Sequence, residues 1–287
     1  MNEPGPGRRT PDRYAVVGNP IHHSLSPRIH TLFAAQTGQN LSYETLLGTP
    51  GQFPEEVNGW FAQGFLGLNV TVPFKEEAFA LAQVLTERAR HAGAVNTLWC
   101  DEHHELNGDN TDGIGFCRDL ERLGLDVAGR SILILGAGGA TRGLLQPLLE
   151  RGAARLVIAN RTRARAEDLV DDFHSLAPDT DLSACGLDQL PGGPFDLVVN
   201  ATAAGLADGG LDLPPGLVGP ESLAYDLVYG PAARRFLDWA EAAGCRHTSD
   251  GLGMLVEQAA EAFAIWRGVR PETEPVLREL RHETTAT

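Results

Sequence analysis

The sequence contains a single lysine, Lys75, among 23 lysine and arginine residues. An ammonium group in a shielded site can release its proton near neutral pH, whereas a guanidinium group cannot. A chain that otherwise uses arginine therefore marks Lys75 as a candidate for proton transfer. Lys75 follows a strand-like stretch at residues 67–72 and Pro73, and α/β proteins place reactive groups at such strand ends. An ordinary surface lysine is the alternative interpretation.

A candidate partner for Lys75 is Asp112, in the polar segment Gly108-Asp-Asn-Thr-Asp-Gly113 that opens a predicted helix. Its carboxylate could accept a hydrogen bond from a substrate hydroxyl while orienting the lysine, so that alkoxide and proton donor meet. Either aspartate of the segment could instead cap the helix. We interpret Asp109 as a turn or cap residue and Asp112 as the functional one, on the resemblance given below.

Further polar residues gather at predicted strand ends. Ser24 and Ser26 are two positions apart, so in an extended chain both hydroxyls face one side. Asn69 and Thr71 share that spacing, and Asn96 follows Gly93-Ala-Val. Each residue alone is more typical of a turn or cap, but together they predict a cradle for a substrate with several hydroxyls and one carboxylate.

A glycine-rich turn at residues 136–143, Gly-Ala-Gly-Gly-Ala-Thr-Arg-Gly, follows the apolar strand-like run at residues 131–135 and precedes a helical pattern. Glycines let backbone N–H groups approach a pyrophosphate, and the helix N-terminus adds partial positive charge there. Thr141 occupies the third glycine position of the dinucleotide fingerprint, which weakens the motif. A tight turn in a layer that binds nothing is the alternative.

The residues that follow the next predicted strand, Asn160-Arg-Thr-Arg-Ala-Arg165, indicate the cofactor. An NAD enzyme would place a carboxylate there for the ribose hydroxyls, and none is present. Arg161 and Arg165 can instead clamp a 2′-phosphate, and Asn160 and Thr162 can add hydrogen bonds. The sequence therefore favours NADP(H). A solvated helix start is the other interpretation, although cations there oppose the helix dipole unless an anion binds.

Strand-like and helical stretches alternate along the whole chain, which predicts an α/β fold with parallel pairing. The expected strands are 14–18, 41–47, 67–72, a hairpin of 96–99 with 105–106, then 131–135, 155–159, 195–199 and 223–228. The expected helices begin at Ser26 as N-cap and elsewhere span 53–61, 86–91, 111–123, 138–151, 163–174, 231–243, 251–266 and 272–282. The run at 131–135 should be buried on both faces of its sheet.

Composition narrows the function classes. A chain of 287 residues favours two domains, and a net charge of −15 argues against nucleic-acid binding. The four cysteines are too scattered for a zinc, redox or disulfide framework, so we expect no metal. The absence of an apolar leader or a run of ~20 apolar residues predicts a cytoplasmic protein without a membrane partner.

The chain resembles shikimate dehydrogenase from Tyr14 onward, in six segments that occur in order. They are GNPIHHSLSP at 18–27, NVTVPFKE at 69–76, GAVNT at 93–97, GDNTDG at 108–113, GAGGATRG with NRTRAR at 136–143 and 160–165, and DGLGMLVEQAA at 250–260. The resemblance implies reversible NADPH-dependent reduction of 3-dehydroshikimate to shikimate, in aromatic amino-acid biosynthesis. It also implies a substrate domain around an inserted Rossmann-like, doubly wound NADP-binding domain.

The same resemblance assigns roles to residues. It makes Lys75 and Asp112 the catalytic pair. Shikimate would be held by Ser24, Ser26, Asn69, Thr71, Asn96, Asp112, Tyr229 and Gln258. NADP would be lined by Gly136, Ala137, Gly138, Gly139, Ala140, Asn160, Arg161, Thr162, Arg165, Leu227 and Gly251, with Thr202 and Met254 as weaker neighbours. The expected domains are residues 1–112 with a mobile tail at 1–12, residues 113–250 for NADP, and helices at 251–287 that return to the substrate domain.

Two departures from the family pattern put minor cofactor contacts in doubt: alanines replace expected serines at residues 200–205, and the segment from Gly230 lacks a usual threonine. Two other functions stay open. One is a quinate dehydrogenase or an enzyme of dual quinate and shikimate specificity, which the arginine clamp and the two serines oppose. The other is a regulator that binds NADP without turnover. The resemblance leaves monomer and homodimer equally open.

Overall fold

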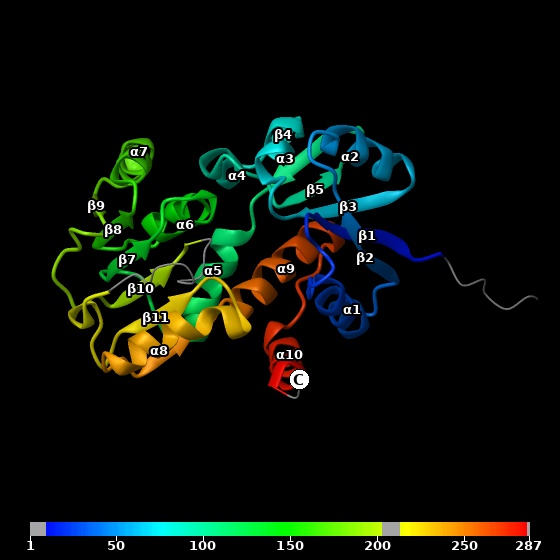
Figure 1. Ribbon diagram of the computed structural model, residues 1–287. Coiled ribbons are helices and arrows are strands. Elements are labelled where there is room, and N and C mark those ends of the chain that lie inside the picture. The colour runs from blue at the N-terminus through cyan, green and yellow to red at the C-terminus, as the bar shows by residue number, and fades with distance from the viewer. Residues whose placement is uncertain (1–9, 203–212, 286–287) are drawn as a thin grey trace, which may run out of the picture. The chain divides into compact units, whose positions relative to one another are not determined.

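The computed structural model describes residues 10–202 and 213–285 and divides into two compact units (Figure 1). Among these residues, unit 1 takes in 10–90, 94–111 and 259–279, and unit 2 takes in 91–93, 112–202, 213–258 and 280–285. The expected two-domain α/β architecture is confirmed. Most of the expected N-terminal tail, residues 1–9, lies outside the described residues, and the first strand already begins at Asp12.

Unit 1 is built on a mixed six-stranded sheet in the order β2-β1-β3-β5-β6-β4. Its strands are β1 (Asp12–Gly18), β2 (Leu41–Leu47), β3 (Phe65–Val70), β4 (Val84–Leu85), β5 (Thr97–Cys100) and β6 (Leu106–Asp109). The expected parallel pairing holds for β1 with β2 and β3, and the expected hairpin of β5 with β6 is confirmed. The antiparallel pairing of β5 with β3 departs from the expected parallel sheet. Residues 101–105 join β5 to β6, and so short a link permits a hairpin but no parallel crossover.

Both faces of this sheet are packed. On one face Val17, Leu68 and Val70 join a cluster with Phe53 and Phe74, whose rings stack with centroids 4.8 Å apart. On the other face Tyr14 and Val16 join a cluster with Tyr43. The helices that belong to this unit in whole or in part are α1 (Ser26–Thr37), α2 (Phe53–Ala62), α3 (Lys75–Leu81), α4 (Glu87–Ala92), α9 (Leu252–Arg267) and α10 (Thr273–Thr285). The sheet thus holds the ends of β1 and β3, from which the candidate substrate residues emerge, in a fixed frame.

The start of α1 differs from the expectation. The N-cap is Leu25, not Ser26, and Ser26 is already helical. Ser24 N–H donates to the carbonyl of Ile21 at 3.0 Å, which closes a turn, so the expected extended spacing of the two serines is also wrong. The side chain of Ser24 instead accepts from the N–H of Ser26 at 3.2 Å. This local bond brings the two hydroxyl-bearing residues together without an extended chain.

Unit 2 is built on a six-stranded, fully parallel sheet in the order β12-β11-β10-β7-β8-β9. Its strands are β7 (Ser131–Leu135), β8 (Arg155–Asn160), β9 (Asp181–Gly186), β10 (Leu197–Asn200), β11 (Leu223–Asp226) and β12 (His247–Ser249). Its other helices are α5 (Asp112–Arg122), α6 (Gly139–Glu150), α7 (Arg163–Phe173) and α8 (Arg234–Ala242), with short 3₁₀ turns at His174–Leu176, Pro215–Leu217 and Gly230–Ala233. Strand order reverses at β7, which makes the fold doubly wound.

The apolar run in β7 is buried on both faces, as predicted. Ile132 and Ile134 join one core cluster together with residues of α5, α6 and α7, whereas Leu133 and Leu135 join a second cluster with residues of α8. Successive strand residues point to opposite faces, so a sheet covered by helices on both sides needs a continuous apolar strand. This burial fixes the end of β7, where the glycine turn begins.

A buried histidine gives unit 1 a pH-dependent stability. His30 on α1 is 1% exposed, its ring stacks on Tyr43 with centroids 4.1 Å apart, and neither ring nitrogen has a hydrogen-bond partner among the described residues. Burial lowers the pKa of His30 to about 3, and the nearby amide of Asn69 offsets this only in part. The imidazole is therefore neutral in the folded protein.

We expect this histidine to destabilise the fold in mild acid. A histidine in the unfolded chain takes up a proton below its ordinary pKa of about 6.5, and the buried ring does not, so stability is lost as the pH falls below that value. The loss amounts to about 2 kcal/mol at pH 5. Urea unfolding of wild type and His30→Phe at pH 8 and pH 5 should show a decline about 2 kcal/mol smaller in the variant. Equal declines in the two proteins would contradict this assignment.

Candidate functional site

The turn between β7 and α6 is shaped to receive a phosphate group. Gly136 has φ +111°, and a Cβ there would lie 2.9 Å from the carbonyl oxygen of Ala201, so no larger residue fits. At Gly138 and Gly139 an added Cβ would meet nothing within 4 Å. Open space above two glycines at the N-terminus of a 12-residue helix is what a pyrophosphate needs to reach the backbone N–H groups. The residues present therefore fit a dinucleotide.

Thr141, the departure from the glycine fingerprint, is accommodated inside the helix. Its side chain is fully buried and its hydroxyl donates to the carbonyl of Gly136 at 2.8 Å, which ties the turn to the first helical turn. Close packing falls instead to Gly143, whose carbonyl oxygen lies 2.2 Å from where a Cβ of Gly113 would be. The threonine thus stabilises the turn without filling the phosphate space.

The arginines after β8 differ in what they contact. Arg163 donates to Glu167 at 2.8 Å and to Gln189 at 3.4 Å. Arg161 and Arg165 are exposed, and within residues 10–202 and 213–285 their side chains have neither hydrogen-bond nor ion-pair partners. The two arginines that the sequence assigned to a 2′-phosphate are thus the two that remain available for an anion.

Asn160 and Thr162, the other predicted cofactor residues of this segment, meet at the end of β8. The amide of Asn160 donates to the carbonyl of Thr162 at 2.9 Å, and Thr162 is the N-cap of α7. This bond holds the backbone turn that carries Arg161. The hydroxyl of Thr162 makes no capping bond.

The ends of β10 and β11 bring together the remaining predicted cofactor residues. Asn200 accepts from the N–H and hydroxyl of Thr202 and donates from its amide to Asp226 at 2.7 Å. Leu227 N–H donates to the Asn200 carbonyl at 3.0 Å. A Cβ on Gly251 would lie 2.2 Å from the Leu227 carbonyl, so only glycine allows this approach. Thr202, Leu227 and Gly251 therefore share one polar corner of unit 2.

Burial raises the pKa of Asp226 to about 6, and the negative charge of Asp250 acts in the same direction. The hydrogen bonds that Asp226 accepts from Val228 N–H and Asn200 lower the pKa, but they only partly offset the burial. Met254 reaches the same end of the sheet through its backbone. Its N–H donates to the hydroxyl of Tyr225 at 3.3 Å, and that hydroxyl donates to the fully buried Asp119 at 2.6 Å. The first turn of α9 is thus held against β11 and α5.

Asp112 is the first residue of α5 and is half-buried. Three residues later, a Cβ on Gly115 would lie 2.6 Å from the backbone nitrogen of Gln258. Gln258, 8% exposed, donates from its amide to the carbonyl of Leu255. Within unit 2 the structure therefore places the predicted substrate residue Gln258 one helical turn from Asp112. Tyr229 follows β11 in the same unit, and burial raises its pKa.

The other predicted substrate residues lie in unit 1. Asn69 is the penultimate residue of β3 at 6% exposure, Thr71 directly follows β3, and Asn96 directly precedes β5 at 3% exposure. Asn69 and Asn96 touch, because the amide of Asn69 donates to the Asn96 carbonyl at 3.1 Å. Lys75 begins α3, and its carbonyl accepts from Val95 N–H at 2.9 Å. Since Lys75 belongs to unit 1 and Asp112 to unit 2, their pairing stays a prediction.

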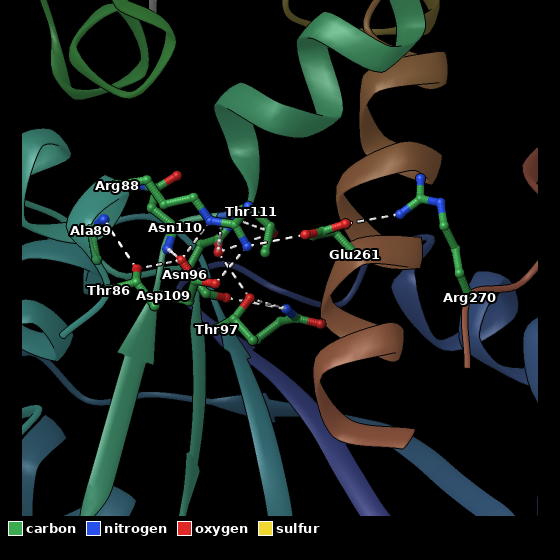
Figure 2. A network of polar contacts seen from close by, with 11 residues as sticks. Thr86, Arg88, Ala89, Asn96, Thr97, Asp109, Asn110, Thr111, Glu261 and Arg270 are labelled. Atoms are coloured by element: carbon green, nitrogen blue, oxygen red, sulfur yellow. Dashed lines mark hydrogen bonds and ion pairs between the residues drawn. The ribbon is translucent and has the colours of Figure 1, made fainter. Parts of the chain in front are cut away.

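Asp109 has structural contacts that the sequence interpretation missed. It is 2% exposed, and its carboxylate accepts two bonds from Arg88, at 2.7 and 2.6 Å, one from the Thr86 hydroxyl at 2.6 Å and one from Asn110 N–H at 2.7 Å. Figure 2 shows this network, in which Arg88 also reaches Glu261 of α9 at 3.2 Å. Asp109 is therefore the centre of a buried ion pair and not a simple turn residue.

The network fixes Asn96, a predicted substrate residue, and Thr111. The carbonyl of Asp109 accepts from Asn96 N–H at 2.9 Å, and the side-chain oxygen of Asn96 accepts from Thr111 N–H at 2.9 Å (Figure 2). Thr111 directly precedes Asp112. A carboxylate and an arginine that are 21 positions apart carry no periodic signal, so their pairing was invisible in the sequence.

Two further features bear on the class of protein. In the part of the chain that the structure describes, no helix combines the length and apolarity of a membrane span. Over the same residues, no group of three or more His, Cys, Asp or Glu side chains is placed as a metal site would require.

A doubly wound parallel sheet with an open glycine turn, together with a second unit on a mixed sheet, defines a two-domain dehydrogenase that binds a dinucleotide.

Comparison with known proteins gives the family. Family models described as the shikimate dehydrogenase substrate binding domain, shikimate / quinate 5-dehydrogenase and the shikimate 5′-dehydrogenase C-terminal domain match residues 16–98, 120–206 and 251–281. The shikimate dehydrogenase (NADP(+)) of Thioalkalivibrio sulfidiphilus is 54% identical, covering 94% of this chain and 98% of its own length. That of Cellvibrio japonicus is 52% identical, covering 95% and 98%.

A solved structure agrees. Shikimate 5-dehydrogenase from Thermus thermophilus, in complex with NADP(H) and shikimate, is 36% identical and has a TM-score of 0.83, covering 94% of this chain and 99% of that one. The chain belongs to the shikimate dehydrogenase family and is an NADP-dependent oxidoreductase. The resemblance seen in six sequence segments is confirmed, as is the preference for NADP.

The two unpaired arginines lead to a test of cofactor selection. We expect Arg161→Ala and Arg165→Ala each to raise KM for NADP about 10- to 100-fold, because each removes a charge-assisted hydrogen bond to the 2′-phosphate. KM for NAD, which has no such phosphate, should change little. Arg163→Ala is the matched control, since Arg163 is engaged by Glu167 and Gln189. The clamp would be misassigned if Arg163→Ala weakened NADP binding as much as the other two.

Proposed function

We propose that this protein catalyses the reversible NADPH-dependent reduction of 3-dehydroshikimate to shikimate, a step of aromatic amino-acid biosynthesis. The observation that carries the proposal is identity of more than half, over nearly the full length, to relatives named shikimate dehydrogenase (NADP(+)). The open glycine turn and the two available arginines support it independently, because they suit a phosphorylated dinucleotide.

In the proposed reaction the cofactor supplies a hydride to the carbonyl carbon of the substrate. Lys75 gives a proton from Nζ to the oxygen of that carbonyl and takes it back in the reverse direction. Asp112 accepts a hydrogen bond from a substrate hydroxyl, which orients the ring toward the lysine. Arginine could supply positive charge at position 75 but not an exchangeable proton near neutral pH.

The proposed substrate contacts are those that the family resemblance implies. Ser24 and Ser26 would hold the carboxylate end, and Asn69, Thr71 and Asn96 would meet hydroxyls. Tyr229 and Gln258 would add contacts from unit 2. Asn69, Asn96 and Gln258 are nearly inaccessible, and a buried amide is stabilising only when it is hydrogen-bonded, so protein contacts hold these amides in fixed orientations. On this proposal residues 1–112 and 251–287 serve the substrate and residues 113–250 serve NADP.

The proposal also covers the compartment and the partners of the protein. It places the enzyme in the cytoplasm, with shikimate and 3-dehydroshikimate as its small-molecule partners and without nucleic-acid or membrane partners. The charge of −15 supports the absence of a nucleic-acid partner, since such binding depends on clustered cations. Monomer and homodimer are equally compatible with it.

Substrate choice can be tested directly. We expect kcat/KM with shikimate and NADP to exceed that with quinate and NAD by at least about 100-fold, because the arginine pair favours the 2′-phosphate and Ser24 with Ser26 suits the shikimate-type cradle. The measurement is the absorbance of reduced cofactor with each of the four substrate and cofactor combinations. A preference for quinate with NAD would replace the proposed function by that of a quinate dehydrogenase.

The role of Lys75 can be separated from its charge. We expect Lys75→Ala and Lys75→Arg both to lower kcat by about 10²- to 10⁴-fold, the usual contribution of a general acid, with NADP affinity nearly unchanged. Lys75→Arg keeps the positive charge and most of the length, so it is the control for electrostatics. Activity that survives in Lys75→Arg would refute proton transfer, and activity that survives in both would point to a different catalytic group.

A further inference from the structure

A chain of hydrogen bonds crosses the sheet of unit 1 and includes two of the candidate substrate residues, Asn69 and Asn96. The hydroxyl of Tyr43 on β2 donates to Oδ1 of Asn69 on β3 at 2.7 Å. The amide nitrogen of Asn69 donates to the Asn96 carbonyl at 3.1 Å and to Oγ1 of Thr97 at 3.2 Å. The hydroxyl of Thr97 then donates to Oδ1 of Asn96 at 2.9 Å.

The direction of this chain is fixed by groups that can act in only one way. The Asn96 carbonyl can only accept, so the side of the Asn69 amide that faces it must be the nitrogen. The N–H of Thr111 can only donate, so the atom of Asn96 that meets it must be the oxygen. Both N–H groups of Asn69 are therefore used inside the protein. What Asn69 has left is a lone pair on its oxygen.

Tyr43 is held in a rigid setting. Its ring lies nearly parallel to that of His30, with an interplanar angle of 5° and centroids 4.1 Å apart, and the residue is 9% exposed. Burial raises the pKa of Tyr43 well above its ordinary value, so the hydroxyl keeps its proton and remains a donor. Tyr43 lies opposite Tyr14 in the β1–β2 register, and Asn69 lies opposite Val16, so the phenol reaches across β1 to its partner.

We propose that Tyr43 is a positioning residue that, together with the Asn96 carbonyl and Thr97, holds the amide of Asn69 with its oxygen available to accept, and thereby favours a substrate whose facing hydroxyl donates. This inference rests on the proposed function, in which Asn69 contacts the substrate. Without the phenolic hydroxyl the amide is held only through its nitrogen, by the Asn96 carbonyl and Thr97. The amide oxygen is then positioned less firmly, and its hydrogen bond from the donating hydroxyl would weaken.

Tyr43→Phe tests the positioning role, and Tyr14→Phe is its control. Tyr14 is 2% exposed in the same sheet, but its hydroxyl accepts from Arg267 and makes no bond to Asn69. We expect Tyr43→Phe to raise KM for shikimate about 10-fold, the effect of one hydrogen bond, while KM for NADP stays within twofold. Tyr14→Phe should leave both constants within twofold. Thr97→Val, which removes the acceptor on the other side of the amide, should resemble Tyr43→Phe.

Fluorinated substrates give a readout that a loss of stability would not produce. Fluorine accepts weakly and cannot donate, so shikimate with one non-reacting hydroxyl replaced by fluorine should lose about 10- to 100-fold in kcat/KM with wild type at the position that meets Asn69. In Tyr43→Phe that discrimination should shrink to less than about threefold. The inference is overturned if Tyr43→Phe discriminates as wild type does at every position. Wild type without any turnover of shikimate would instead overturn the proposed function and this inference with it.

Discussion

The helix that begins at Asp112 lies so close to its neighbours that two of its first four residues must be glycine. A methyl group on Gly113 would meet the Gly143 carbonyl at 2.2 Å, and one on Gly115 would meet the backbone of Gln258 at 2.6 Å. Such contacts cannot relax through a side chain, because the opposing atoms are backbone. The approach of α5 to α6 and α9 therefore sets where Asp112 lies relative to the glycine turn and to Gln258 within unit 2.

The residues just before Asp112 are held by different forces. Asp109 is buried beside Arg88, and removing Arg88 alone would leave this carboxylate buried without a compensating charge, which is far costlier than the pair itself is stabilising. Four hydrogen bonds to one carboxylate also restrict the backbone that carries Asn96 and Thr111. One short segment is thus fixed by polar contacts in unit 1 and by steric contacts in unit 2. This dual anchoring explains why acidic, amide and glycine residues crowd into six positions.

Sequence periodicity predicted the regular elements, but it did not predict features that depend on contacts with neighbouring parts of the fold. The strand at 131–135, its glycine turn and the hairpin around residue 103 were predictable, because apolar runs and turn residues mark them locally. The polar strand Asp181–Gly186 and the three-residue strand His247–Ser249 were missed, since both lie at sheet edges with little burial. Ser26 was taken as a cap because serine precedes proline, yet the turn closed by Ser24 moves the cap to Leu25. The ion pair of Asp109 depends on tertiary contact alone.

Net charge and local charge act on different length scales here. A protein at −15 repels both a phosphorylated dinucleotide and a carboxylate substrate at long range, but at physiological salt that repulsion is screened beyond about 8 Å. Binding must then depend on cations placed at the ligand. Arg163 is engaged by its neighbours, whereas Arg161 and Arg165 on either side of it are available. The acidic surface therefore sets no obstacle to an anionic cofactor, provided that these two guanidinium groups stay unpaired until it arrives.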